Sequence, residues 1–273
     1  MSAPPSRFRR TICLVALGLC LGGMPAVADE QGPGDGAPAI ILGDQTPADF
    51  LDLIGQRTKA RWRLLFRPPP PTPPTDRGRA ALILGGLMAD SFLIWQAGDS
   101  QQFRNNNQEV LSYCRTLGLG EKLLPRLMAQ GKMAESNEWK ELRHEIVDSH
   151  QVLIRMLREQ KDDDLAVMID LGLWLRLLEI VSTVVVENAT VEVRPLCIGS
   201  PVILQEIRDD FNRISMAKHE EPMFKHIGAA IEEISVLWRR GTTPELPTAE
   251  QVTKTHEKLK EIMQAMLVVE KQP

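Results

Sequence analysis

The sequence predicts an all-α fold, an antiparallel multi-helix bundle or a stack of helical hairpins with about nine helices. Apolar residues recur at helical spacing, as in Trp139, Leu142, Ile146, Leu153 and Leu157, which share one face of a helix. Proline, glycine and capping residues mark helix ends along the chain, and no pair of alternating segments indicates two partnered strands. Hydrophobic residues make up 43% of the chain, enough to form a core.

The N-terminus has the pattern of a signal peptide over residues 1–28. Three arginines (Arg7, Arg9 and Arg10) precede a short apolar run, 12–23, and Ala26-Val27-Ala28 supplies the small residues that a signal peptidase needs. The run is shorter than the ~20 residues of a membrane-spanning helix. We therefore expect cleavage after Ala28 and export, which makes the mature chain periplasmic or secreted.

Two features of this leader indicate other types of export signal. Cys20 suggests a lipoprotein, but the preceding Leu19 is bulky where a lipoprotein peptidase needs a small residue. The Arg9-Arg10 pair is an incomplete twin-arginine motif, so the general secretory route and the twin-arginine route both stay open.

The next segments lead into the folded part. Residues 29–45 are rich in Gly, Pro and Ala and are expected to be disordered. An N-terminal helix is predicted over 46–67, because Thr46 can cap it and Pro47 suits its first position. Residues 68–75 form a polyproline linker, expected to act as a stiff spacer between this helix and the helical domain at 76–273.

Within the helical domain we expect helices over 76–97, 99–118, from 121, over 136–161, from 162, from 200, over 222–241 and over 248–270. The first of these places Ala81, Gly85 and Ala89 at steps of four, a stripe of small residues that allows another helix to approach closely. The short connections favour antiparallel neighbours in the chain.

Charge and hydropathy exclude some classes of function. The chain has 32 basic and 36 acidic residues, and residues 1–28 hold three arginines and no acid, so cleavage leaves 29 basic residues and a net charge of −7. Nucleic-acid binding is not expected without a basic tract. No transmembrane segment is expected after cleavage, because the most apolar stretch, Leu165–Val186, is interrupted by charges at positions 170, 176 and 179.

Cys114 and Cys197 are the cysteines that remain after cleavage. In an oxidising compartment they can pair in a disulfide. The alternative is two buried thiols that behave as small hydrophobic groups. The sequence leaves both open and shows no Cys-x-x-Cys motif.

Three residues are candidates for a site between helices. His150 lies between Ile146 and Leu153 on an apolar helix face. Asp170 lies among Leu and Val residues on the central helix. A separate polar stripe of that helix is formed by Arg176, Glu179, Thr183 and Glu187. Asp90 lies in the apolar helix 76–97. A buried charge of this kind marks either a ligand or acid–base site or a structural ion pair, and the structural interpretation is favoured for each.

Common catalytic and metal-binding motifs are absent from the sequence. The sequence has no Gly-x-Ser-x-Gly, no Walker loop and no His-Glu-x-x-His, and His219 and His226 are too far apart for a usual zinc pair. No cofactor and no metal site are predicted, and an enzyme is not favoured.

The preferred hypothesis is therefore an exported, soluble helical protein that acts as a protein-interaction or scaffold module, with a protein as its partner. One alternative is a helical ligand- or metal-binding protein, or an enzyme, with a site around His150, Asp170 or Asp90. The second alternative is a peripheral membrane-surface protein that binds through the basic N-terminal helix; docking of that helix onto the domain or a partner is favoured over membrane contact.

Overall fold

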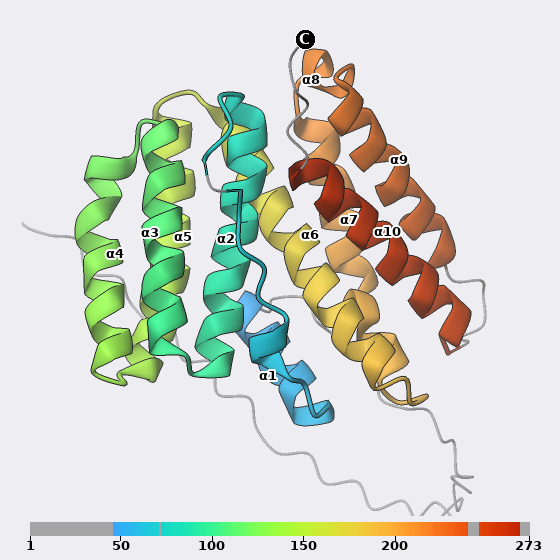
Figure 1. Ribbon diagram of the computed structural model, residues 1–273. Helices are drawn as coiled ribbons and strands as arrows, with labels where there is room; N and C mark the ends of the chain where they lie inside the picture. Colours follow the sequence, from blue (N-terminus) through green and yellow to red (C-terminus); the bar gives the residue numbers. More distant parts are fainter. Residues whose placement is uncertain (1–45, 71, 240–245, 268–273) are drawn as a thin grey trace, which may run out of the picture. The chain divides into compact units, whose positions relative to one another are not determined.

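The computed structural model describes residues 46–70, 72–239 and 246–267 (Figure 1). In this part of the chain every regular element is a helix, so the predicted all-α bundle is confirmed. The predicted signal peptide and the segment 29–45 lie outside the described residues.

The described residues form ten α-helices and two short 3₁₀ helices. The additional α-helix relative to the prediction is the four-residue α8. In chain order the elements are α1 (Pro47–Arg57), η1 (Trp62–Leu64), α2 (Arg77–Ala97), α3 (Ser100–Thr116), α4 (Gly120–Glu135), α5 (Trp139–Glu159), α6 (Asp163–Glu187), η2 (Arg194–Ile198), α7 (Pro201–Arg213), α8 (Met216–His219), α9 (Pro222–Leu237) and α10 (Ala249–Leu267).

The helices form two groups that meet at α2 and α6. Helices α2 to α5 pack on one another in chain order, while α7 and α10 pack on α6, and α9 packs on α7 and α10. Figure 1 shows α2 and α6 side by side between these groups. Helices α2 and α6 run parallel, because three helices joined by short loops separate them along the chain and return it to the same direction.

Two glycines allow α2 and α6 to touch through their backbones. A Cβ atom at Gly85 would lie 2.1 Å from the carbonyl oxygen of Ile169, and one at Gly172 would lie 2.1 Å from the carbonyl oxygen of Leu82. Neither position can hold a side chain without separating the helices. The predicted close approach at Gly85 is thus confirmed, and Gly172 supplies the matching position on α6.

The N-terminal helix packs on the domain. Phe50, Leu51 and Ile54 are fully buried against α2 and α6. Arg143 of α5 forms ion pairs with Asp49 and Asp52 of α1, the second at 3.3 Å. The apolar side of α1 is therefore covered by the rest of the chain.

The predicted helix 46–67 and the predicted spacer are both wrong in detail. α1 ends at Arg57, because Thr58 is extended and its hydroxyl donates to the carbonyl of Ile54 at 2.7 Å. Residues 58–70, here called the strap, then run along the helices. Trp62 of the strap lies near Gly55, and Pro69 lies against α2 and α10, so these prolines do not hold the first helix apart from the domain.

Candidate functional site

Two of the three predicted site residues meet in space. Nε2 of His150 on α5 lies 2.9 Å from Oδ1 of Asp170 on α6, although the angle is outside the range of a hydrogen bond. The side chains of His150 and Asp170 are 20% and 25% exposed. The apolar residues around Asp170 in the sequence indicated a more deeply buried position.

An open groove of about 680 Å³ lies over this pair. His150, Arg155, Arg158 and Asp170 contribute to its lining. Arg155 and Arg158 are exposed, one turn apart on α5, and neither has an ion pair or a hydrogen bond within the described part of the chain. The groove thus offers two free guanidinium groups beside a histidine–carboxylate contact, which suits a small ligand with an anionic group.

Asp210 of α7 belongs to the same side of the bundle. Its burial raises the pKa of its carboxyl group to about 6, against the opposing effect of Arg213 and with a further contribution from the charge of Asp170. Its carboxyl group lies 2.7 Å from the guanidinium of Arg213, which supplies its countercharge.

Asp90, the third predicted residue, lies in a different place. It is 4% exposed and accepts two contacts from Arg176 of α6, at 2.9 Å from Nε and 2.8 Å from Nη2. Asp90 and Asp170 therefore have different partners, Arg176 for Asp90 and His150 for Asp170.

Arg176 is the centre of a buried ion cluster. Nη1 of its guanidinium donates to Glu179 one turn along α6, and Nη2 donates to the main-chain carbonyl of Leu65 in the strap at 2.6 Å. Glu179 also accepts from Arg67 of the strap. Two buried charges of α6 thus bind α2 on one side and the strap on the other.

The polar stripe that the sequence predicts on the central helix is buried at Arg176 and Glu179. Their side chains are only 3% and 5% exposed. The strap and α10 cover this side of α6, and periodicity within one helix does not show what another segment covers. Arg67, Arg176 and Glu179 are therefore the residues that sequence reasoning missed, and no motif in the sequence marks them.

Burial disfavours the charged form of both Asp90 and Arg176, but it determines the pKa shift of Asp90 alone. It raises the pKa of Asp90 to about 6, since the loss of hydration outweighs the attraction of Arg176. Burial also opposes the charge of Arg176, but the attraction of Asp90 and Glu179 is stronger and raises its pKa. Arg176 thus stays charged, while Asp90 can gain a proton in mildly acidic solution.

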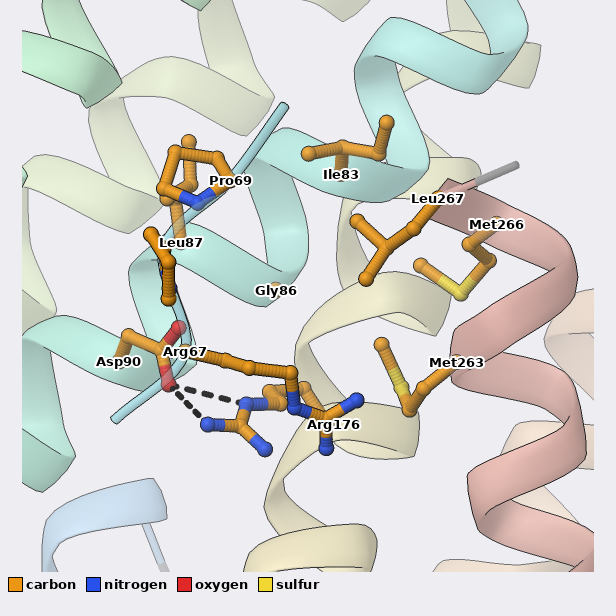
Figure 2. Close-up of a pocket in the computed structure, with 11 residues that line it drawn as sticks. Arg67, Pro69, Ile83, Gly86, Leu87, Asp90, Arg176, Met263, Met266 and Leu267 are labelled. Atoms are coloured by element: carbon orange, nitrogen blue, oxygen red, sulfur yellow. Dashed lines mark hydrogen bonds and ion pairs between the residues drawn. The ribbon is translucent and has the colours of Figure 1, made fainter. Parts of the chain in front are cut away.

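A small pocket lies beside the cluster, between the strap, α2, α6 and α10 (Figure 2). Its volume is about 30 Å³, room for about two water molecules. Figure 2 shows Arg67 extending from the strap across the pocket toward Met263, with Arg176 and Asp90 at one end. The remaining lining is largely apolar and consists of Pro68, Pro69, Ile83, Gly86, Leu87, Met266 and Leu267.

The cysteines do not form a disulfide in this structure. Cys114 and Cys197 are free and buried, and burial raises the pKa of each thiol to about 12. Cys114 lies on α3, which packs on α2 and α4, whereas Cys197 lies in η2, which packs on α6, α7 and α10.

No group of three potential metal-ligating side chains occurs among the described residues. His219 instead stacks on Phe211, with 4.7 Å between the ring centroids, and its Nε2 lies 2.9 Å from the carbonyl oxygen of Phe211. These contacts account for His219 without a metal.

One described helix, α2, is long and apolar enough to cross a membrane, and 83% of its most apolar window is buried within the structure. The most apolar stretch of the sequence, 165–186 in α6, does not pass this test, whereas α2 is the one helix among the described residues that does. A buried core helix commonly passes such a test, so the finding is weak evidence for a membrane span.

Comparisons with known protein families, with curated proteins and with solved structures gave no significant match.

Proposed function

We propose that this protein is an exported helical module that binds a protein partner. The N-terminal pattern of basic residues, apolar run and small residues supports export. The observation that carries the binding function is the strap, because the groove between α2, α6 and α10 holds it through one main-chain carbonyl and one arginine side chain. Extended peptides are bound in the same manner by protein-interaction domains.

Site-specific photo-crosslinking in the native envelope tests this proposal. A photoreactive residue at Pro68, which is exposed beside the groove, is expected to give a crosslinked species of defined mass. The same residue at Met128, which is 56% exposed on α4, serves as the control. The absence of any crosslink at Pro68, or identical crosslinks at both positions, would contradict the proposal.

A second candidate function is binding of a small anionic ligand at the groove of His150 and Asp170. The convergence of these residues beside the free guanidinium groups of Arg155 and Arg158 favours it. Titration with inorganic phosphate and short dicarboxylates, followed through the imidazole resonances of His150, is expected to give saturable shifts that are lost in the Arg155→Ala/Arg158→Ala variant. Unchanged resonances at millimolar ligand would exclude it.

Membrane binding through the N-terminal helix receives less support. Insertion needs an exposed apolar side, and Phe50, Leu51 and Ile54 are fully buried. Release of α1 from the bundle would have to precede any such contact.

A further inference from the structure

We infer that the groove between α2, α6 and α10 recognises an extended arginine–proline peptide, and that the strap occupies it in cis until a partner segment of the same chemistry replaces it. This inference rests on the proposed protein-binding function and names the chemistry of the partner. The contacts of the strap supply the template.

The first element of recognition is main-chain. Arg176 donates to the carbonyl oxygen of Leu65 at 2.6 Å, and its guanidinium is held in place by Asp90 on one side and Glu179 on the other. A main-chain carbonyl is present in any peptide, so this contact gives affinity without reading a side chain. A donor fixed by two carboxylates loses little conformational entropy when it binds.

The second element is specific for arginine. Glu179 is a buried carboxylate that accepts from Arg176 within its own helix and from Arg67 of the strap. If Arg67 leaves, Glu179 retains Arg176, and water or another cation must replace the lost donor. A planar guanidinium can pair with Glu179 while it lies across the pocket toward Met263, whereas the ammonium group of lysine is a compact point charge.

The third element is a surface for proline. Pro68 and Pro69 line the same pocket as Met263 and Met266 of α10. Consecutive prolines are already extended, so they lose little freedom on binding. Methionine side chains are flexible and adapt to different partners.

The strap is suited to displacement. It has one 3₁₀ turn as its regular structure, Leu64 is 69% exposed, and the Arg67 side chain is 35% exposed. It also leaves a cavity of about 30 Å³ beneath it, so it does not fill the groove. α1 and α2 hold its two ends, which keeps the strap near the groove at an effective concentration on the order of millimolar. A partner peptide must therefore compete with a local segment.

Peptide binding to the full chain tests the inference. The probe is a fluorescent peptide with the sequence of residues 63–70, Arg-Leu-Leu-Phe-Arg-Pro-Pro-Pro. An Arg67→Ala chain, whose strap has lost its contact with Glu179, is expected to bind this peptide at least ~10-fold more tightly than the wild-type chain, because the cis competitor is weakened. The same peptide with alanine at the position of Arg67 is expected to lose binding.

Two variants complete the design. Arg63→Ala removes a strap arginine whose side chain is 68% exposed and whose ion pair with Asp99 is long, at 3.7 Å. An exposed pair of this kind contributes little, so the variant is expected to leave peptide affinity at the wild-type value. Pro68→Gly loosens the strap without removing Arg67 and is expected to raise peptide affinity, as Arg67→Ala does. This variant replaces Arg67→Ala in the test if circular dichroism shows that the Arg67→Ala chain is unfolded.

The outcomes separate this inference from the proposed function. Equal binding by the loosened and wild-type chains, or equal binding of the alanine-substituted peptide, would overturn the inference. Peptide binding without a crosslinked partner at Pro68 would support the groove and refute the wider function. A crosslinked partner without peptide binding would show that the partner uses other chemistry.

Discussion

Alanine at Gly85 is expected to destabilise the bundle strongly, because this glycine lies where α2 meets the backbone of α6. The new Cβ would lie 2.1 Å from the carbonyl oxygen of Ile169 and 2.7 Å from the backbone nitrogen of Leu173. A carbon–oxygen contact needs about 3.3 Å. The helices must therefore separate by more than about 1 Å, since neither atom belongs to a side chain that can rotate away.

The size of the effect follows from two opposing contributions. A gap of that size removes a quarter to a half of the dispersion energy of the contacts along the interface, and overpacking of a core commonly costs about 1–3 kcal/mol or more. Alanine gains about 1 kcal/mol over glycine within a helix. With the cost at the upper end of that range, about 3 kcal/mol, and the gain of about 1 kcal/mol, we expect a net loss of about 2 kcal/mol from the free energy of unfolding. This is a large fraction of the roughly 5–15 kcal/mol typical of a protein.

Gly131 of α4 provides the matched control. A Cβ there meets no atom within 4 Å, so Gly131→Ala should stabilise the protein by about 1 kcal/mol. Urea denaturation followed by circular dichroism measures both variants. A Gly85→Ala variant as stable as Gly131→Ala would refute the backbone-contact argument.

The double variant gives a further check. Gly172 contacts the carbonyl of Leu82 at the same crossing of α2 and α6. Once Gly85→Ala has separated the helices, Gly172→Ala should cost less than it does alone, because the two sites share one interface. Additive losses would show that the two glycines act independently.

Three other predictions concern the ion cluster, the thiols and the docking of α1. The pKa of Asp90 rises from 3.8 to about 6 on folding, so its contribution to stability is full below pH 3.8 and is lost as the pH rises through 6. Asp90→Asn should remove this pH dependence, which amounts to about 3 kcal/mol of unfolding free energy. An unchanged slope of unfolding free energy against pH in this variant would contradict the prediction. Cys114 and Cys197 should resist a thiol reagent in the native protein and both react in denaturant, whereas a failure to react in denaturant would reveal a disulfide. Arg143→Ala should speed hydrogen exchange in residues 47–57, because it removes the ion pairs that hold α1 on the domain. The control Lys140→Ala changes an exposed residue of the same helix and should leave the exchange rate unchanged. Equal exchange rates in the two variants would show that Arg143 does not hold α1 in place.

The candidate site was partly visible in the sequence. His150 and Asp170 stood out because a polar side chain on an apolar helix face needs a partner, and in the structure they lie beside each other. Arg155 and Arg158 did not stand out, because exposed arginines on a helix are common. Their lack of partners among the described residues appears only when the neighbouring helices are in place.

The fold class and several helix boundaries follow from local signals in the sequence. Thr46 accepts from the backbone of Asp49 and so caps α1, and the proline at the start of α7 and α9 lies in the first turn, as local backbone chemistry requires. Such signals act within a few residues of the chain, so they can be recognised without knowledge of the fold. The close approach at Gly85 could be predicted for the same reason, since the absence of a side chain is a local property.

The positions of the buried charges and the contacts of the strap depend on packing between distant segments. Residues 58–67 have no residue that forbids a helix, yet the carbonyl of Leu65 binds Arg176 and Arg67 binds Glu179, and both partners lie more than a hundred residues further along the chain. The burial of Arg176 and Glu179 depends on the strap and α10 covering one side of α6. Contacts between segments so distant in sequence depend on how all the helices pack, and hydrophobic periodicity within one helix carries no record of that packing.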